Sequence, residues 1–404
     1  MSSITARRKG VNKKLTVTLF YIMVTLFAAS DMAMVIAMVW YTLSMTKSTF
    51  LVGIILCIST VIPFILEKWL NKKHSTQLSI NRLIVIRLIA FTTILVFTLM
   101  HLTNFVIGFL MIAFVVGMID YFTISTLEAQ NTKLVLAGVL DSHKSARFIE
   151  TAIQLGAFGG DFLGGVAIDS FSVTTTLTTI SAMAIMFLGL LFIPQIRTTT
   201  LLPQQEQKES EEAIKHSYGS AKEIFLVILA LGMIGFHIGA FNSLVPIIFQ
   251  KLNTWSATSL GIASGLAGVG AFIGAMIPGL SINLLWLVTG VTVMDIALVY
   301  SPSALLACSA AFLIGFCLNQ LRISFRKYLI EQSHNPRVAD LLATRSSFYY
   351  LLLSGSAPMI LTLFTTDALF GLEASRPLMI LTSLVLGLVV IARLVMSRKT
   401  YRFN

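Results

Sequence analysis

The chain has 404 residues, of which 56% are hydrophobic and only 12% are charged. Soluble domains carry about 25% charged residues, so this chain has too few charges to cover soluble domains with water-facing groups. Its net charge of +11 would suit a nucleic-acid-binding protein, but the basic residues lie in short clusters between long apolar runs. That pattern is typical of the loops of a membrane protein, and it excludes a nucleic-acid-binding face.

The apolar runs are long enough to cross a bilayer. The first run, from Leu15 to about Tyr41, is too long for a secretory signal peptide, so we expect it to remain as a membrane span. A spanning helix needs about 20 mainly apolar residues. The sequence predicts twelve spans, near residues 15–41, 49–66, 83–101, 105–127, 148–168, 174–194, 224–249, 257–279, 283–300, 303–325, 346–366 and 377–396.

The basic residues orient these spans. With the N-terminus in the cytoplasm, only Lys47, Lys251 and Arg376 of the 29 lysines and arginines fall outside the cell. Arg87 and Arg322 lie within spans, and all the others fall in cytoplasmic segments. Such an asymmetry is the positive-inside signal of a multi-pass membrane protein. It predicts a plasma (inner) membrane protein with both termini in the cytoplasm.

A polar stretch separates six spans from six. Residues 195–222 form the only long polar segment, which is typical of a solvated cytoplasmic linker. The two halves also echo each other weakly, since LSMTKSTFLVG joins spans one and two while LNTWSATSLG joins spans seven and eight. The sequence therefore predicts an all-α membrane protein with twelve transmembrane helices in two six-helix bundles, residues 1–194 and 223–404.

Local motifs point to one family. The segment WYTLSMTKSTFLVG and the span-five segment QLGAFGGDFLGG resemble the drug- and siderophore-exporting branch of the major facilitator superfamily, which includes macrolide-efflux proteins. Gly156, Gly160, Gly164 and Gly165 match the branch's motif G-x-x-x-G-P-x-x-G-G, with Asp161 in place of the proline. Small residues at this spacing allow helices to approach closely.

The loop between spans two and three matches the family less well. The family pattern there is G-x-x-x-D-R-x-G-R-R, whereas this chain reads ILEKWLNKK. The resemblance implies that Glu67 and Lys68 stand in for the acid–base pair that takes part in gating, and that Lys72 and Lys73 form the basic cluster. Both glycines of the pattern are missing.

Ionisable side chains inside the spans are the candidates for function. Each costs at least about 2.5–3.5 kcal/mol to place at mid-membrane, so such groups face a bundle interior or a wet cavity. The resemblance implies that spans one, four, seven and ten line the cavity. The cavity candidates are Asp31, Asp120, His237, Asn242, Asn319, Gln320 and Arg322, with aromatic walls from Tyr121, Phe236 and Phe241.

Each ionisable candidate also has a structural interpretation. Asp31 and Asp120 are the preferred proton carriers, although Asp31 could instead pair with a neighbouring helix. Asp161 is a further candidate for proton coupling that could simply brace the glycine contact, and His237 could bind a backbone carbonyl. We expect Asp295 to be structural. Arg87, Arg322 and His237 are possible partners of these carboxyl groups. Alternatively, we expect Arg87 to extend toward the cytoplasmic interface, and Arg322 either to do the same or to contact an anion. For each of these seven residues, the structure can therefore distinguish a functional role from a structural one.

The expected function is proton-coupled export by alternating access, because a protonated carboxyl crosses the membrane far more cheaply than a carboxylate. Mixed charge on the cavity helices favours a polar, partly anionic substrate, and with the branch resemblance it suggests a siderophore of the citrate–hydroxamate (aerobactin) type. Multidrug or macrolide efflux is the alternative, and an uptake symporter is a third hypothesis. The chain lacks the common hydrolase, metalloprotease and nucleotide-binding motifs, so we expect no enzyme.

No cofactor or metal is expected beyond the proton gradient. Cys57, Cys308 and Cys317 each lie in an apolar run without metal-ligand spacing. The expected partners are a small-molecule substrate and the lipid bilayer, and transporters of this family often work as monomers.

Overall fold

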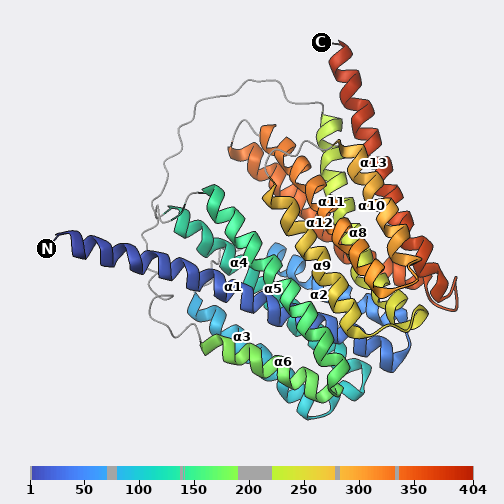
Figure 1. Ribbon diagram of the computed structural model, residues 1–404, viewed down its shortest axis with the longest axis horizontal. Coiled ribbons are helices and arrows are strands. Elements are labelled where there is room, and N and C mark those ends of the chain that lie inside the picture. Colours follow the sequence, from blue (N-terminus) through green and yellow to red (C-terminus); the bar gives the residue numbers. More distant parts are fainter. Residues whose placement is uncertain are drawn as a thin grey trace. The chain divides into compact units, whose positions relative to one another are not determined.

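The computed structural model describes residues 2–70, 80–136, 140, 142–189, 221–277, 283–332 and 336–403. Its regular structure over these residues is entirely helical (Figure 1). Twelve α-helices make up this described part: α1 (Ser2–Thr46), α2 (Thr49–Leu70), α3 (Ile80–Leu99), α4 (Val106–Leu136), α5 (Ser142–Ser170), α6 (Val173–Leu188), α8 (Ala221–Ile247), α9 (Ala257–Met276), α10 (Leu284–Val299), α11 (Ala304–Glu331), α12 (Pro336–Phe364) and α13 (Ser375–Phe403).

The predicted spans correspond to these helices one by one. Nine helices within the described residues are long and apolar enough to cross a membrane, and parts of α2, α6 and α10 form shorter apolar helices. The prediction of an all-α membrane fold is therefore confirmed. The short turn expected between spans eight and nine falls at residues 278–282, outside the described residues.

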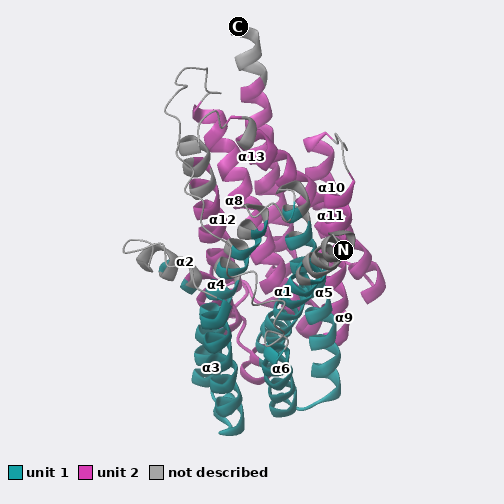
Figure 2. Cartoon of the chain, turned by 90° about the vertical axis from the view of Figure 1, so that its left-hand side faces the viewer, with its two compact units in different colours: residues 1–41, 62–206 teal, residues 42–61, 207–404 magenta. Residues whose placement is uncertain are grey.

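The chain divides into two compact units, coloured teal and magenta in Figure 2. Unit 1 comprises residues 1–41 and 62–206, and unit 2 comprises residues 42–61 and 207–404. The end of α1 and most of α2 thus group with the C-terminal helices. Nearly all of the predicted linker, residues 195–220, lies outside the described residues, so the division at 195–222 stays a prediction.

The core of unit 1 is built on α1. Phe20, Met23 and Phe27 lie one helical turn apart or nearly so, and all three are buried. They belong to one apolar cluster with Leu83 of α3 and Leu127 of α4. An α1 face that is apolar at this spacing therefore holds the neighbouring helices around it.

A row of glycines brings α5 against α1. A side chain at Gly156 would collide with the backbone carbonyl of Thr25, and one at Gly160 would collide with that of Ala29. Gly164 lies in the same way against Ala33. The repeat of four residues keeps all three glycines on one face of α5. The prediction that these glycines allow close helix approach is confirmed.

Glycines also allow close helix contacts in two places within unit 2. Gly232, Gly235 and Gly239 of α8 face the backbone and side chains of α12 around Tyr349, Tyr350 and Ser354. Between α9 and α11, Gly270 lies against the carbonyl of Phe312 and Gly315 against that of Ala267. Because membrane helices associate largely by such packing, these seams fix the arrangement of helices within the unit.

Adjacent glycines on α5 provide a test. Replacing Gly160 by Ala should lower the stability of the protein by about 1–3 kcal/mol, because the added methyl group collides with Ala29. Replacing Gly159 by Ala should be neutral or slightly stabilising, because nothing lies within 4 Å of its new Cβ. Thermal unfolding of both variants in detergent measures the difference. Equal midpoints would contradict the α1–α5 seam.

Candidate functional site

The centre of unit 1 holds a buried ion pair. Arg87 of α3 donates from Nη1 to Oδ2 of Asp31 and from Nη2 to Oδ1 of Asp31, both at 2.8 Å. Arg87 is fully buried and Asp31 is 8% exposed. Two parallel hydrogen bonds between a guanidinium and a carboxylate are the strongest form of such a pair. The interaction therefore joins α1 to α3 inside the unit.

Other side chains complete the surroundings of Arg87. Thr123 of α4 accepts a hydrogen bond from Nη1 at 2.8 Å, and Ser30 accepts one from Nη2 at 3.1 Å. The guanidinium also lies over the rings of Phe27, at 4.1 Å, and Phe91, at 5.2 Å. The prediction that Arg87 extends to the interface is wrong, since an ion pair, hydrogen bonds and two aromatic faces together stabilise its charge inside the bundle.

A second carboxyl group lies beside this pair. Asp120 is half-buried, and it is close enough to Asp31 and Arg87 for their charges to act on it. It precedes Thr123 by three residues, so both face the same side of α4. Within the described residues Asp120 has no hydrogen-bond or ion-pair partner. The cluster thus contains two carboxyl groups and one guanidinium.

Unit 2 contains a different buried pair. His237 of α8 lies with Nε2 3.5 Å from Oδ1 of Asp295 of α10, and both side chains are fully buried. On its other side, Nδ1 of His237 is 2.8 Å from Oγ1 of Thr382 of α13. His237 thus connects α8 with Asp295 of α10 on one side and with Thr382 of α13 on the other.

Asp161 and Arg322 have distinct surroundings. Asp161 is 7% exposed, follows the seam glycine Gly160, and has no polar partner in the described part of the chain. Arg322 of α11 places its guanidinium 5.1 Å from the ring centroid of Tyr350 of α12. A cation against an aromatic face is the arrangement that a planar anionic group could approach.

Two predicted cavity residues instead connect helices. Asn319 donates its side-chain amide to the carbonyl of Ala271 at 2.6 Å, and Gln320 donates to the carbonyl of Gly274 at 2.6 Å. Both bonds run from α11 to the backbone of α9. These amide nitrogens therefore stabilise the tight α9–α11 seam, which the sequence pattern did not reveal.

Four further candidates differ in how deeply they are buried. Asn242 is exposed, Phe241 is buried, and Phe236 is half-buried. Tyr121 is half-buried and lies edge-on to Phe122. Gly165, a further predicted residue, is buried. Glu67 and Lys68 lie in α2, but their side chains are outside the described part of the structure. Lys72 and Lys73 lie wholly outside the described residues.

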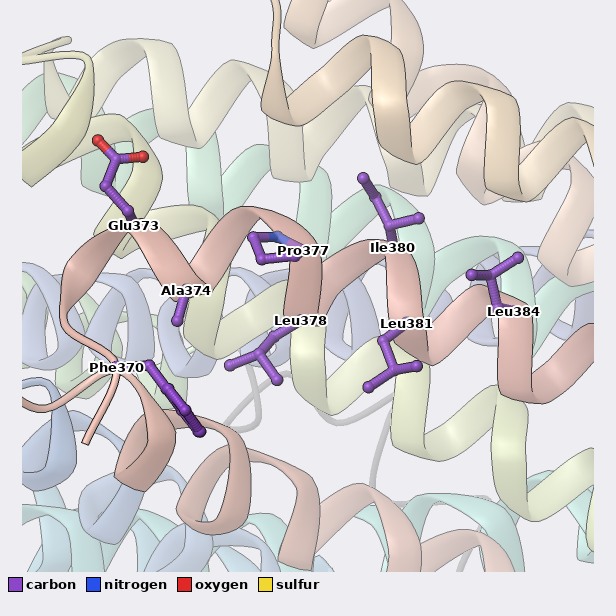
Figure 3. A pocket seen from close by; sticks show the side chains of 8 residues that line it. All are labelled: Phe370, Glu373, Ala374, Pro377, Leu378, Ile380, Leu381 and Leu384. Atoms are coloured by element: carbon purple, nitrogen blue, oxygen red, sulfur yellow. The ribbon is translucent and has the colours of Figure 1, made fainter.

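A groove is formed by residues 370–384. Figure 3 shows it over the start of α13, lined mainly by apolar side chains that include Phe370, Pro377, Leu381 and Leu384. Its volume is about 640 Å³, and Glu373 is the acidic residue at its edge. This lining offers no cluster of charged side chains that could hold a polar substrate.

The sequence identified the ionisable residues within the spans but not the side chains that they contact. Thr123 and Thr382 are ordinary threonines within apolar runs, and nothing in their spacing distinguishes them. Arg87 was one of the possible partners of the carboxyl groups within the spans, but the sequence did not indicate which carboxyl group it contacts.

The ion pair predicts strong coupling between its members. Asp31→Asn and Arg87→Gln should each lower stability by about 3–5 kcal/mol, because each leaves an uncompensated buried charge. The double variant should lose much less than the sum of the two. Unfolding midpoints of the four proteins form a double-mutant cycle that measures the coupling. Additive losses would mean that the two side chains do not interact.

Comparison with known proteins identifies the fold. No protein-family model and no curated protein sequence matches the chain. Among solved structures, a bacterial homologue of the iron transporter ferroportin in an inward-facing state aligns with a TM-score of 0.71 and 16% identity, covering 95% of this chain and 98% of that one. The nucleoside transporter NupG aligns with a TM-score of 0.65 and 12% identity, covering 94% and 99%.

A bacterial homologue of the human lysosomal transporter Spinster gives a similar result. It aligns in its inward-facing, unoccupied state with a TM-score of 0.65 and 12% identity, covering 96% of this chain and 97% of that one. At such identities the likeness concerns the fold. The chain therefore has the fold of these membrane transporters, which is the fold that the resemblance to the major facilitator superfamily implies.

Proposed function

We propose that the protein is a proton-coupled secondary transporter that exports a small polar molecule across the inner membrane. The observation that carries this proposal is the charge imbalance of the buried cluster in unit 1, where Asp31 and Asp120 share one guanidinium, that of Arg87. A transporter that uses a proton gradient needs a group whose charge changes inside the membrane, and this cluster supplies one.

The geometry favours Asp120 as the proton carrier. The carboxylate of Asp31 is held by two charge-assisted hydrogen bonds from Arg87, which stabilise its ionised form. Asp120 has no such bond within the described residues. When Asp120 is protonated the cluster is neutral, and when it is ionised the cluster carries one negative charge. Because an uncompensated charge is costly in this environment, the two states favour different surroundings.

This charge change is the element that alternating access requires. A conformation that exposes Asp120 to water accommodates the ionised form, whereas a conformation that encloses it favours the protonated form. Proton uptake on one side and release on the other would then drive the cycle in one direction. Solved transporters of the same fold support a transport function, and they support it over an enzymatic one.

The substrate proposal depends on Arg322. A guanidinium lying on the ring of Tyr350 offers both a positive charge and an aromatic surface. That combination suits a polar, partly anionic compound, and we propose a siderophore of the citrate–hydroxamate type. Efflux of drugs or macrolides is the second candidate, favoured by the abundance of aromatic and apolar side chains. Uptake by symport would use the same charges in the opposite direction.

Replacing Asp120 by Asn tests the coupling. The variant should fold normally, because Asp120 has no polar partner in the described residues that the change would leave unpaired. It should lose transport driven by a pH gradient, and it should keep exchange of substrate down its own gradient. Proteoliposomes with an imposed pH gradient provide the measurement.

The control for this experiment is Asp367→Asn. Asp367 is exposed in the turn that follows α12, so its removal deletes a carboxyl group without touching the cluster. It should transport like the unmodified protein. If Asp120→Asn also shows undiminished pH-driven transport, the assignment of Asp120 as proton carrier is wrong.

The substrate is tested in iron-limited cells of the source organism with and without the gene. An iron-chelating metabolite should accumulate inside the deletion strain and decrease in the medium, and Arg322→Gln should restore export poorly. Export of added drugs alone, with no change in native metabolites, would support multidrug efflux and remove the argument from Arg322. Loss of uptake in the deletion strain would support a symporter.

A further inference from the structure

The buried pair in unit 2 has an unusual arrangement of hydrogen-bond donors. His237, Asp295 and Thr382 come from α8, α10 and α13, and each is at most 2% exposed. No hydrogen bond of good geometry from the described residues reaches either oxygen of Asp295 or Nε2 of His237, although the hydroxyl group of Ser383 lies close to Asp295. These unpaired atoms face each other, with Nε2 3.5 Å from Oδ1.

The hydroxyl group of Thr382 determines which nitrogen of His237 carries a proton. Thr382 donates its only hydroxyl proton to the carbonyl of Met379 at 2.7 Å. At the 2.8 Å contact with His237 its oxygen must therefore accept, so Nδ1 is the donor. In a neutral imidazole only one nitrogen is protonated, and Nε2 then presents a lone pair toward Asp295.

The hydroxyl group of Ser383 lies close to Asp295 but has only one proton to donate. Ser383 donates its proton to the carbonyl of Ile380 at 2.8 Å. An ionised Asp295 would therefore point its negative charge at the lone pair of His237, with no donor on either oxygen. Such a buried, unpaired carboxylate is strongly unfavourable. One additional proton between the two side chains removes this conflict, whether it resides on Asp295 or on Nε2.

The other ionisable groups on the packed helices are largely engaged elsewhere. Arg376 of α13 contacts Glu373 and Asn253, and Arg393 of the same helix pairs with Glu223 of α8. Asp295 is the only acidic or basic residue of α10. The remaining ionisable groups on α8, α10, α11 and the turns after α8 and α10 are Lys222, Lys251, Tyr300, Cys308, Cys317, Arg322, Arg326, Lys327, Tyr328 and Glu331.

We propose that His237 and Asp295 form a proton-binding site in unit 2 that holds one proton between Nε2 and Oδ1. This site is separate from the cluster around Asp120, and three helices enclose it completely. The proton can therefore enter or leave only when these helices move apart. Its contribution to transport rests on the proposed function, whereas the presence of the proton rests on the hydrogen-bond geometry alone.

The chemistry of the site favours a proton over a metal ion. Among the described residues there is no group of three His, Cys, Asp or Glu side chains that could hold a metal. Only one nitrogen and one carboxylate are available, since Nδ1 is committed to Thr382. Zinc, for comparison, takes three or four protein ligands. A single shared proton satisfies both atoms.

Spectroscopy of the purified protein in nanodiscs, without substrate, tests the site directly. Nitrogen-15 NMR of labelled histidine should show His237, assigned by the loss of its signals in His237→Gln, with a protonated Nδ1 throughout the neutral pH range. Infrared spectroscopy should show a protonated carboxyl band that disappears in Asp295→Asn, or else NMR should show that Nε2 of His237 is protonated as well. An ionised Asp295 beside a neutral His237 protonated on Nε2 would overturn the proposal.

Two hydroxyl variants separate the site from general packing. Thr382→Val removes the acceptor of the Nδ1 proton, so the two tautomers of His237 should become mixed. Ser383→Ala is the matched comparison at the next position. Ser383 lies close to Asp295 and makes no contact with Nδ1 of His237, so the proton should remain on Nδ1 in this variant. A Thr382→Val protein with unchanged His237 signals would contradict the derived tautomer.

Proton counting in proteoliposomes tests the contribution to transport. Asp295→Asn supplies a permanent N–H donor to Nε2, so the variant should fold and should move one proton fewer for each substrate molecule. An unchanged ratio of protons to substrate would remove the pair from coupling. If the unmodified protein transports nothing but the spectra show the shared proton, the proposed function fails while the proton-binding site stands.

Discussion

The structure depends on one constraint, which is that every charge placed within the membrane needs a partner from the protein itself. Water is absent there, and an unsatisfied ion would shift the balance toward unfolding. In unit 1 the requirement is met by the bidentate contact of Arg87 with Asp31, supported by hydroxyl groups and two phenylalanine rings. The helices that carry these groups are thereby fixed in depth and rotation relative to one another.

Unit 2 meets the same constraint without a permanent cation. A histidine and an aspartate can each gain or lose a proton, so one shared proton can remove the conflict between the carboxylate and the lone pair of Nε2. The difference matters for function. The arginine–carboxylate pair acts as a fixed scaffold through its two parallel hydrogen bonds, whereas a histidine–carboxylate pair changes state with its proton content. A transporter benefits from having both kinds of pair, since one keeps helices in a fixed arrangement while the other can change its charge when a proton binds or leaves.

Hydropathy and charge predicted the twelve spans and the close helix contact made by Gly156, Gly160 and Gly164, because both follow from local composition and spacing. They did not predict which buried groups meet. Arg87 was expected at the interface, yet it pairs with Asp31, and Asn319 and Gln320 were expected in the cavity, yet their amides bind the backbone of α9. Such contacts depend on the rotation of one helix against another, which a single sequence does not encode in any short pattern.

The distance along the chain between Asp31 and Arg87 affects how the protein is made. The two residues are 56 positions apart, so Arg87 is synthesised well after Asp31. At a synthesis rate of about 5–20 residues per second, the aspartate waits roughly 3–11 s for its partner. During that interval the carboxyl group has no guanidinium with which to pair. The ion pair that joins α1 to α3 can therefore form only after α3 has been synthesised.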